Sequence, residues 1–163
     1  MAYTNQPHLA MGQIIPAFSL PGADGMHHSP WDYKQRQNLI LLFLSSASSR
    51  ESQDLLRTFS KAYSAIREER CSILAISQDK VLDNLLTQSV LHLAYPLLAD
   101  PKGEVFSQYT RHNSMLDKYN PCIALADLYN ALYQHWIAER EADLPPIDEL
   151  LDSLQHLNKL CTP

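Results

Sequence analysis

Residues 38–44 read Asn-Leu-Ile-Leu-Leu-Phe-Leu, and residues 45–52 that follow read Ser-Ser-Ala-Ser-Ser-Arg-Glu-Ser. The first run is apolar and of strand length, as is typical of a central strand whose sheet is covered on both faces. The polar run leads into apolar residues spaced at three and four positions, namely Leu55, Leu56, Phe59, Tyr63 and Ile66. This spacing predicts a loop that feeds an amphipathic helix.

The same alternation recurs downstream. Residues 72–77 read as a second buried strand, and a second helix is marked by Val81, Leu82, Leu85, Leu86 and Val90. A strand, helix, strand, helix order implies parallel pairing. Residues 123–126 and 131–137 then flank a tight turn at 127–130, which predicts two antiparallel strands. An apolar stripe over 147–160, after Pro145-Pro146, predicts a final packed helix.

The remaining segments complete one α/β domain over residues 1–163. Residues 1–11 read as an N-terminal arm, and residues 12–21 as an extended segment before turn residues at 22–25. Residues 95–100 predict a short extended piece, which is followed by a short helix ending near Tyr109 and by a polar loop over 110–120. We expect a central sheet of about five strands with helices on both faces.

Composition excludes several classes of function. The net charge is −5 and the basic residues are dispersed, so we expect no nucleic-acid binding. The longest apolar run, residues 39–44, is far too short to span a membrane, and no leader is evident. The odd number of cysteines and the absence of a Cys-x-x-Cys pair argue against a disulfide framework, so we expect a cytoplasmic protein.

Four phrases resemble the alkyl hydroperoxide reductase and thiol-specific antioxidant branch of the peroxiredoxins. They are Gly12-Gln-Ile-Ile-Pro-Ala-Phe-Ser-Leu-Pro21, Leu41-Leu-Phe-Leu44, Ile76-Ser-Gln-Asp79 and Tyr95-Pro-Leu-Leu-Ala-Asp-Pro-Lys-Gly103. The resemblance implies a thioredoxin-like, three-layer fold with a central mixed sheet. It also implies a redoxin, an antioxidant oxidoreductase of cell redox homeostasis, and a homodimer.

The resemblance also implies that the catalytic position is altered. The active loop of the family carries a proline, then a threonine, then the peroxidatic cysteine three residues after that threonine. Alignment backward from Phe59 puts these on Ser45, Ser49 and Ser52. A thiolate attacks the peroxide O–O bond and becomes a sulfenic acid, whereas a serine hydroxyl is a feeble nucleophile without that redox chemistry. The same window resembles a thioredoxin Cys-x-x-Cys site with both cysteines replaced by serine.

A second part of the site is expected at Asn120-Pro121-Cys122. Thioredoxin-like proteins place a cis-proline there, so the resemblance implies a cis Asn120–Pro121 bond. Many peroxiredoxins place an arginine at this position, and only Arg50 or Arg111 is available to replace it.

Each candidate residue has a structural interpretation beside the functional one. Ser49 and Ser52 either cap the helix or form an anion-binding cup at its N-terminus; we favour capping. Cys122 is either a buried, inert cysteine or a relocated reactive thiol; we favour burial. Cys161 has no peroxidatic partner to resolve. The histidines, His27-His28 included, show no metal-site spacing, so we expect no metal and no cofactor.

Two functions from different classes follow. We favour a catalytically silent member of the family that binds an unknown small ligand or protein partner, as a binding or regulatory module. The alternative is a thiol-dependent peroxidase that uses Cys122. We expect the aromatic residues Trp31, Tyr33 and Trp136 to pack at sheet edges, although such a surface also suits dimer contacts.

Overall fold

The computed structural model describes residues 9–160, so Cys161 and the first eight residues of the arm lie outside the described part. Its main sheet contains β3 (Asn38–Leu44), β4 (Cys71–Ser77), β5 (Leu97–Ala99), β8 (Cys122–Ala126) and β9 (Leu132–Ile137). The helices are α1 (Arg50–Glu68), α2 (Val81–Leu91), α3 (Phe106–Tyr109) and α4 (Ile147–Leu160), with 3-10 turns η1 (Pro30–Tyr33) and η2 (Glu141–Asp143).

The strand order is β5-β4-β3-β8-β9, with β3 at the centre. β3 runs parallel to β4, and β4 runs parallel to β5. β8 returns antiparallel beside β3, with Cys122 opposite Phe43, and β9 pairs antiparallel with β8. Every residue of β3 and β4 is buried, as expected for strands covered on both faces. The predicted mixed α/β sheet is confirmed.

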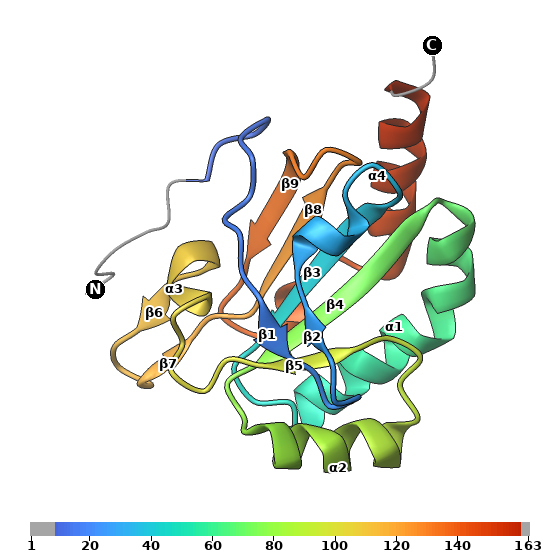
Figure 1. Cartoon of the computed structure of the whole chain (residues 1–163). Helices are drawn as coiled ribbons and strands as arrows, with labels where there is room; N and C mark the ends of the chain where they lie inside the picture. The colour runs from blue at the N-terminus through green and yellow to red at the C-terminus, as the bar shows by residue number, and fades with distance from the viewer. Residues whose placement is uncertain (1–8, 161–163) are drawn as a thin grey trace.

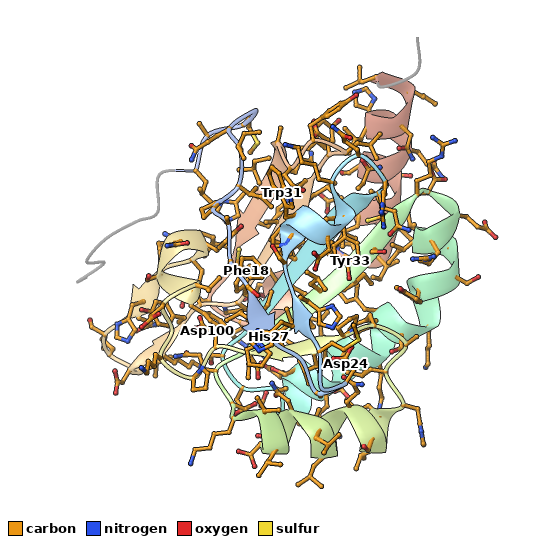
Figure 2. The ribbon with its side chains drawn as sticks, in the orientation of Figure 1. Phe18, Asp24, His27, Trp31, Tyr33 and Asp100 are labelled. Atoms are coloured by element: carbon orange, nitrogen blue, oxygen red, sulfur yellow. The ribbon has the colours of Figure 1, made fainter. Side chains whose placement is uncertain are left out.

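Alternate residues of β3 point into two separate cores, because successive strand side chains face opposite sides of a sheet. Ile40 and Leu42 pack in the core formed with α1 and α4. Leu41 and Phe43 pack in the other core, with α3 and the N-terminal segment, to which Phe18 belongs (Figures 1 and 2). Helices therefore cover both faces of the sheet. On the face that α3 covers, this helix is only four residues long, so the N-terminal segment covers much of the rest.

Two small hairpins lie outside the main sheet. β1 (Leu20–Pro21) pairs with β2 (His27–His28), as the turn residues predicted. β6 (His112–Asn113) pairs with β7 (Lys118–Tyr119), so the segment predicted as a polar loop contains a hairpin. The reason is local, since the side-chain oxygen of Asn113 accepts from the backbone N–H groups of Met115 and Leu116 and closes the turn.

Trp31 does not pack at a sheet edge as predicted. It lies in η1, where its side chain is 64% exposed (Figure 2). A capping box between Ser29 and Asp32 fixes this turn, and the Lys34 ammonium lies 4.1 Å from the centre of the indole ring. The local caps of η1 set the direction of Trp31, and sheet packing does not.

The helix α2 forms where predicted, but its apolar residues do not face the core. Its exposed side chains include Leu82, Leu85, Leu86 and Val90, with Leu82 75% exposed. The buried residues are Asn84 and Thr87. Asn84 accepts from the Ser77 hydroxyl at 2.7 Å and donates to the Leu98 carbonyl at 3.1 Å, so this helix is attached to β4 and β5 by polar contacts. Within residues 9–160, no helix is both long and apolar enough to cross a membrane.

We predict that Asn84→Ala lowers the free energy of unfolding by about 1–3 kcal/mol, because the buried partners Ser77 and the Leu98 carbonyl lose their hydrogen bonds. Urea unfolding followed by circular dichroism measures the change. The matched control is Ser89→Ala, an exposed polar residue of the same helix, which we expect to change stability by no more than about 0.5 kcal/mol. An equal loss from Ser89→Ala and Asn84→Ala would contradict a stabilising role for the two Asn84 hydrogen bonds.

Candidate functional site

The N-terminus of α1 carries Ser49 and Ser52, which the sequence resemblance led us to expect in the catalytic loop. Ser49 is the N-cap residue, and its side-chain oxygen accepts from the Ser52 backbone N–H at 3.2 Å. Its carbonyl accepts from the Gln53 N–H at 2.9 Å, which begins the helix. Ser49 thus has the geometry of a cap, one of the two roles considered for it.

The loop before α1 is fixed by the end of β4. The Asp79 carboxylate accepts from the Ala47 backbone N–H at 2.7 Å and from the Ser46 hydroxyl at 3.3 Å. The Ser45 carbonyl accepts from the Gln78 N–H at 3.3 Å. Because β3 and β4 are parallel, their carboxyl ends meet at this edge, and Asp79 closes the loop across it. Ser45 therefore contributes its backbone carbonyl to the contacts that fix this loop.

Ser52 lies in the first turn of α1 and is fully buried. Its hydroxyl donates to the carboxylate of Glu141 at 3.3 Å. The next residue back along the helix, Glu51, pairs with Arg140, whose Nη2 lies 2.5 Å from Oε1 of Glu51. The hydrogen bond and charge of Arg140 lower the pKa of Glu51, and Glu51 raises the pKa of Arg140.

Arg140 and Glu141 are site residues that the sequence did not reveal. They follow β9 and lie 89 residues beyond their partners in the chain. Arg140 and Glu141 lie shortly before Pro145-Pro146 in the sequence. No local sequence pattern relates this pair to the start of α1, which is far away in the chain. An acidic pocket beside this contact is lined by Glu51, Asp54, Leu55, Thr58, Glu141 and Ala142.

The predicted cis peptide at Pro121 is wrong, since no peptide bond among residues 9–160 is cis. The trans form is the lower-energy state of a prolyl bond, and here the chain passes through it directly into β8. The Pro121 carbonyl accepts from the Ala138 N–H at 3.1 Å, so Pro121 continues the pairing of β8 with β9. The preceding residue, Asn120, is also held in place, because its carbonyl accepts from the Thr110 hydroxyl at 2.8 Å.

The two candidate arginines lie in different parts of the fold, whereas the side-chain oxygens bonded to Ser52 belong to Ser49 and Glu141. Arg50 is the first residue of α1 and is exposed. Arg111 follows α3 and is half-buried. The arginine that contacts this turn of the helix is Arg140, through Glu51.

Cys122 lies on the opposite face of the sheet from α1. It pairs with Phe43 in the β3–β8 register and packs in the core that contains Phe106 and Tyr109. The side chains of α1 pack in the other core. The sheet therefore separates the Cys122 thiol from Ser52, and the expectation that this thiol lies near the altered site is wrong. Strand alternation is the reason, because Pro121 and Cys122 point to opposite faces.

The Cys122 thiol lies in an apolar core with two polar neighbours, because it donates to the Tyr109 carbonyl at 3.5 Å and also contacts His135. Its Sγ lies 3.1 Å from Nε2 of His135, and that nitrogen lies 2.7 Å from the Tyr109 carbonyl oxygen. A carbonyl only accepts, so Nε2 of His135 carries a proton and donates it to Tyr109. Burial raises the pKa of the Cys122 thiol and lowers the pKa of His135. This pair is therefore a neutral thiol beside a neutral imidazole.

The other cysteine in the described residues is also buried. Cys71 is fully buried at the start of β4, and burial raises its pKa. Cys161 lies outside the described residues. Among residues 9–160, no group of three or more His, Cys, Asp or Glu side chains has the arrangement to hold a metal ion.

Known structures share this fold over nearly the whole chain. Peroxidoxin BcpB of Mycobacterium tuberculosis is 20% identical with a TM-score of 0.79, covering 92% of this chain and 99% of its own. AhpC of Enterococcus faecalis is 16% identical with a TM-score of 0.81, covering 93% and 94%. A reduced 2-Cys peroxiredoxin of Plasmodium vivax is 15% identical with a TM-score of 0.81, covering 92% and 97%. These similarities establish the thioredoxin-like fold.

Sequence comparison gives the family. The Rv2521 protein of Mycobacterium tuberculosis H37Rv, whose name places it provisionally among the peroxiredoxins, is 30% identical over 106 residues. The aligned part is 65% of this chain and 67% of that protein. The profile of the AhpC/TSA family matches residues 11–135. Because that match spans most of the sheet together with α1, α2 and α3, the chain belongs to the AhpC/TSA family of peroxiredoxins.

Proposed function

We propose that this chain is a peroxiredoxin-family domain without peroxidase activity, which binds a small ligand or a protein partner through the retained fold. The proposal rests on the expected alignment of Ser52 with the peroxidatic cysteine of the family. It is supported by the contact of this residue, whose buried hydroxyl donates to the carboxylate of Glu141. This side chain is engaged in a contact within the protein and has no thiol chemistry.

The chemistry of the family explains why the substitution matters. In the peroxidase reaction a thiolate attacks one peroxide oxygen, the O–O bond breaks, and sulfur is oxidised to a sulfenic acid that a second thiol reduces. A serine hydroxyl at neutral pH is neither ionised nor oxidisable in this way. A carboxylate next to Ser52 also disfavours any negative charge on the residue at that position.

The second candidate function is a thiol peroxidase that uses Cys122. The observation in its favour is the 3.1 Å approach of Sγ to His135, since an imidazole beside a thiol is the usual means of activation. The observations against it are complete burial, the raised pKa of the thiol and the use of the His135 N–H by Tyr109. We therefore favour the silent domain.

We also propose a homodimer in a reducing, cytoplasmic compartment. The exposed apolar face of α2 supports a dimer, because monomers seldom leave several large apolar side chains of one helix in water. The free, buried thiols Cys71 and Cys122 fit a reducing environment. A monomeric mass at micromolar concentration, measured by sedimentation equilibrium, would contradict the dimer.

We predict that the pure protein does not consume hydrogen peroxide with dithiothreitol as reductant beyond the rate of dithiothreitol alone. The test compares the native protein with Cys122→Ser and Cys71→Ser, the latter being a matched buried thiol. Loss of a measured activity in Cys122→Ser, with retention in Cys71→Ser, would overturn the proposal and establish the second candidate.

We predict that iodoacetamide modifies Cys122 and Cys71 at least about 100-fold more slowly in the native protein than in urea, because labelling of a buried thiol requires opening of the fold. Peptide mapping by mass spectrometry follows each cysteine separately. Selective labelling of Cys122, or its selective conversion to a sulfenic acid by peroxide, would mark it as a reactive site. Equal protection of both thiols agrees with inert core residues.

We predict that His135 contributes to a loss of stability in acid. Burial lowers its pKa in the folded state, while an unfolded histidine binds a proton near pH 6.5. Below that pH the unfolded chain therefore binds more protons at this residue, and the free energy of unfolding falls as the pH falls. Urea titrations at pH 7 and pH 5 should show a smaller loss for His135→Gln than for the native protein.

The control for this titration is His156→Gln, on the exposed surface of α4, which should keep the pH dependence of the native protein. An unchanged pH dependence in His135→Gln would contradict the neutral, buried state of His135. A larger loss between pH 7 and pH 5 in His135→Gln than in the native protein would favour a charged imidazole beside Cys122, and so the second candidate function.

A further inference from the structure

The segment 140–144, which we call the clamp, contacts the first turn of α1 through consecutive side chains. Arg140 pairs with Glu51, and Glu141 accepts from the Ser52 hydroxyl. At its end Leu144 is only 7% exposed and packs in the core shared by α1 and α4. The C-terminal end of the clamp is therefore fixed by burial of Leu144. Its N-terminal end contacts the start of α1 through the charged side chains of Arg140 and Glu141.

The clamp has a fixed shape. The Asp143 N–H donates to the Arg140 carbonyl at 3.1 Å, and the Leu144 N–H donates to the Glu141 carbonyl at 3.2 Å. These bonds form the turn η2, which directs the two charged side chains toward α1. Since Glu141 also lines the pocket with Glu51 and Asp54, the surface beside residue 52 is acidic.

We propose that the clamp lowers the reactivity of any nucleophile at position 52, because the Glu141 carboxylate lies in contact with the side chain of that residue. The inference rests on the proposed function. It adds that the site is closed by two independent changes, the loss of the thiol and the presence of a carboxylate from a distant segment. It also identifies Glu141 as the residue that sets reactivity at this position.

Two physical effects act in the same direction. A carboxylate at hydrogen-bond distance opposes ionisation of a thiol, so less of the nucleophilic thiolate forms at neutral pH. The same carboxylate lies 3.3 Å from the side-chain oxygen of residue 52, so a peroxide that reaches an atom at this position has to compete with it. In that reaction sulfur gains an oxygen as sulfenic acid, the leaving oxygen takes a proton as water or alcohol, and dithiothreitol then reduces the sulfur.

The test places a thiol at the site and varies the clamp. Ser52→Cys is compared with Ser52→Cys/Glu141→Gln, which removes the charge and keeps the shape. The matched control is Ser52→Cys/Asp143→Asn, which removes a carboxylate two residues away in the same turn. The measurement is the rate of iodoacetamide labelling of Cys at position 52 against pH, by peptide mapping, followed by peroxide consumption with dithiothreitol.

We expect Glu141→Gln to lower the apparent thiol pKa by about one unit and to raise labelling at pH 7 about tenfold, with peroxide consumption rising in parallel. Asp143→Asn should leave both within about twofold. Equal pKa and equal rates in Ser52→Cys with and without Glu141→Gln would overturn the proposal. An equal increase from Asp143→Asn would also overturn the proposal, because the effect would then come from the net charge of the turn and not from the contact of Glu141 with residue 52.

A further variant guards against misfolding. Ser52→Cys/Glu141→Asp keeps the charge and withdraws it by one methylene, and we expect its labelling rate to lie between those of the other two. Thermal unfolding by circular dichroism verifies that each variant is folded. Failure of the proposed function would appear separately, as peroxide consumption by the native protein, which contains no thiol at position 52.

Discussion

The burial of β3 on both faces is the constraint on which the rest of this structure depends. A strand with no solvent-facing side sends alternate side chains into two cores, so every neighbour of β3 must belong to one core or the other. This rule places α1 and its Ser52 on one side of the sheet. It places Cys122, opposite Phe43, on the other.

The separation has a chemical consequence. The Cys122 thiol lies on the other side of a close-packed sheet from Ser52, and burial in the apolar core raises the pKa of this thiol. The neighbouring His135 donates its N–H to a backbone carbonyl and does not act on Cys122 as a base. The burial that packs Cys71 and Cys122 into the core also raises the pKa of both thiols, which disfavours the nucleophilic thiolate form.

Polar contacts complete the region around the altered site. Asp79 fixes the serine-rich loop to the end of β4, Ser49 caps α1, and the clamp brings Arg140 and Glu141 against the first turn. The positive end of the helix dipole favours a carboxylate near this turn, and Glu141 supplies one through its contact with the Ser52 hydroxyl.

The sequence by itself determined the parts that rest on local pattern. Apolar runs of strand length identified the central strands, periodic spacing identified α1, α2 and α4, and the serines at 49 and 52 were assigned to the start of α1. Only the tertiary structure decided which face each element buries and which distant residues meet. Periodicity located α2 but not its orientation, because Asn84 attaches it by hydrogen bonds that no hydrophobic pattern encodes. The contact of Glu141 with Ser52 joins positions 89 residues apart, so it exists only once the sheet has brought the end of β9 beside the start of α1.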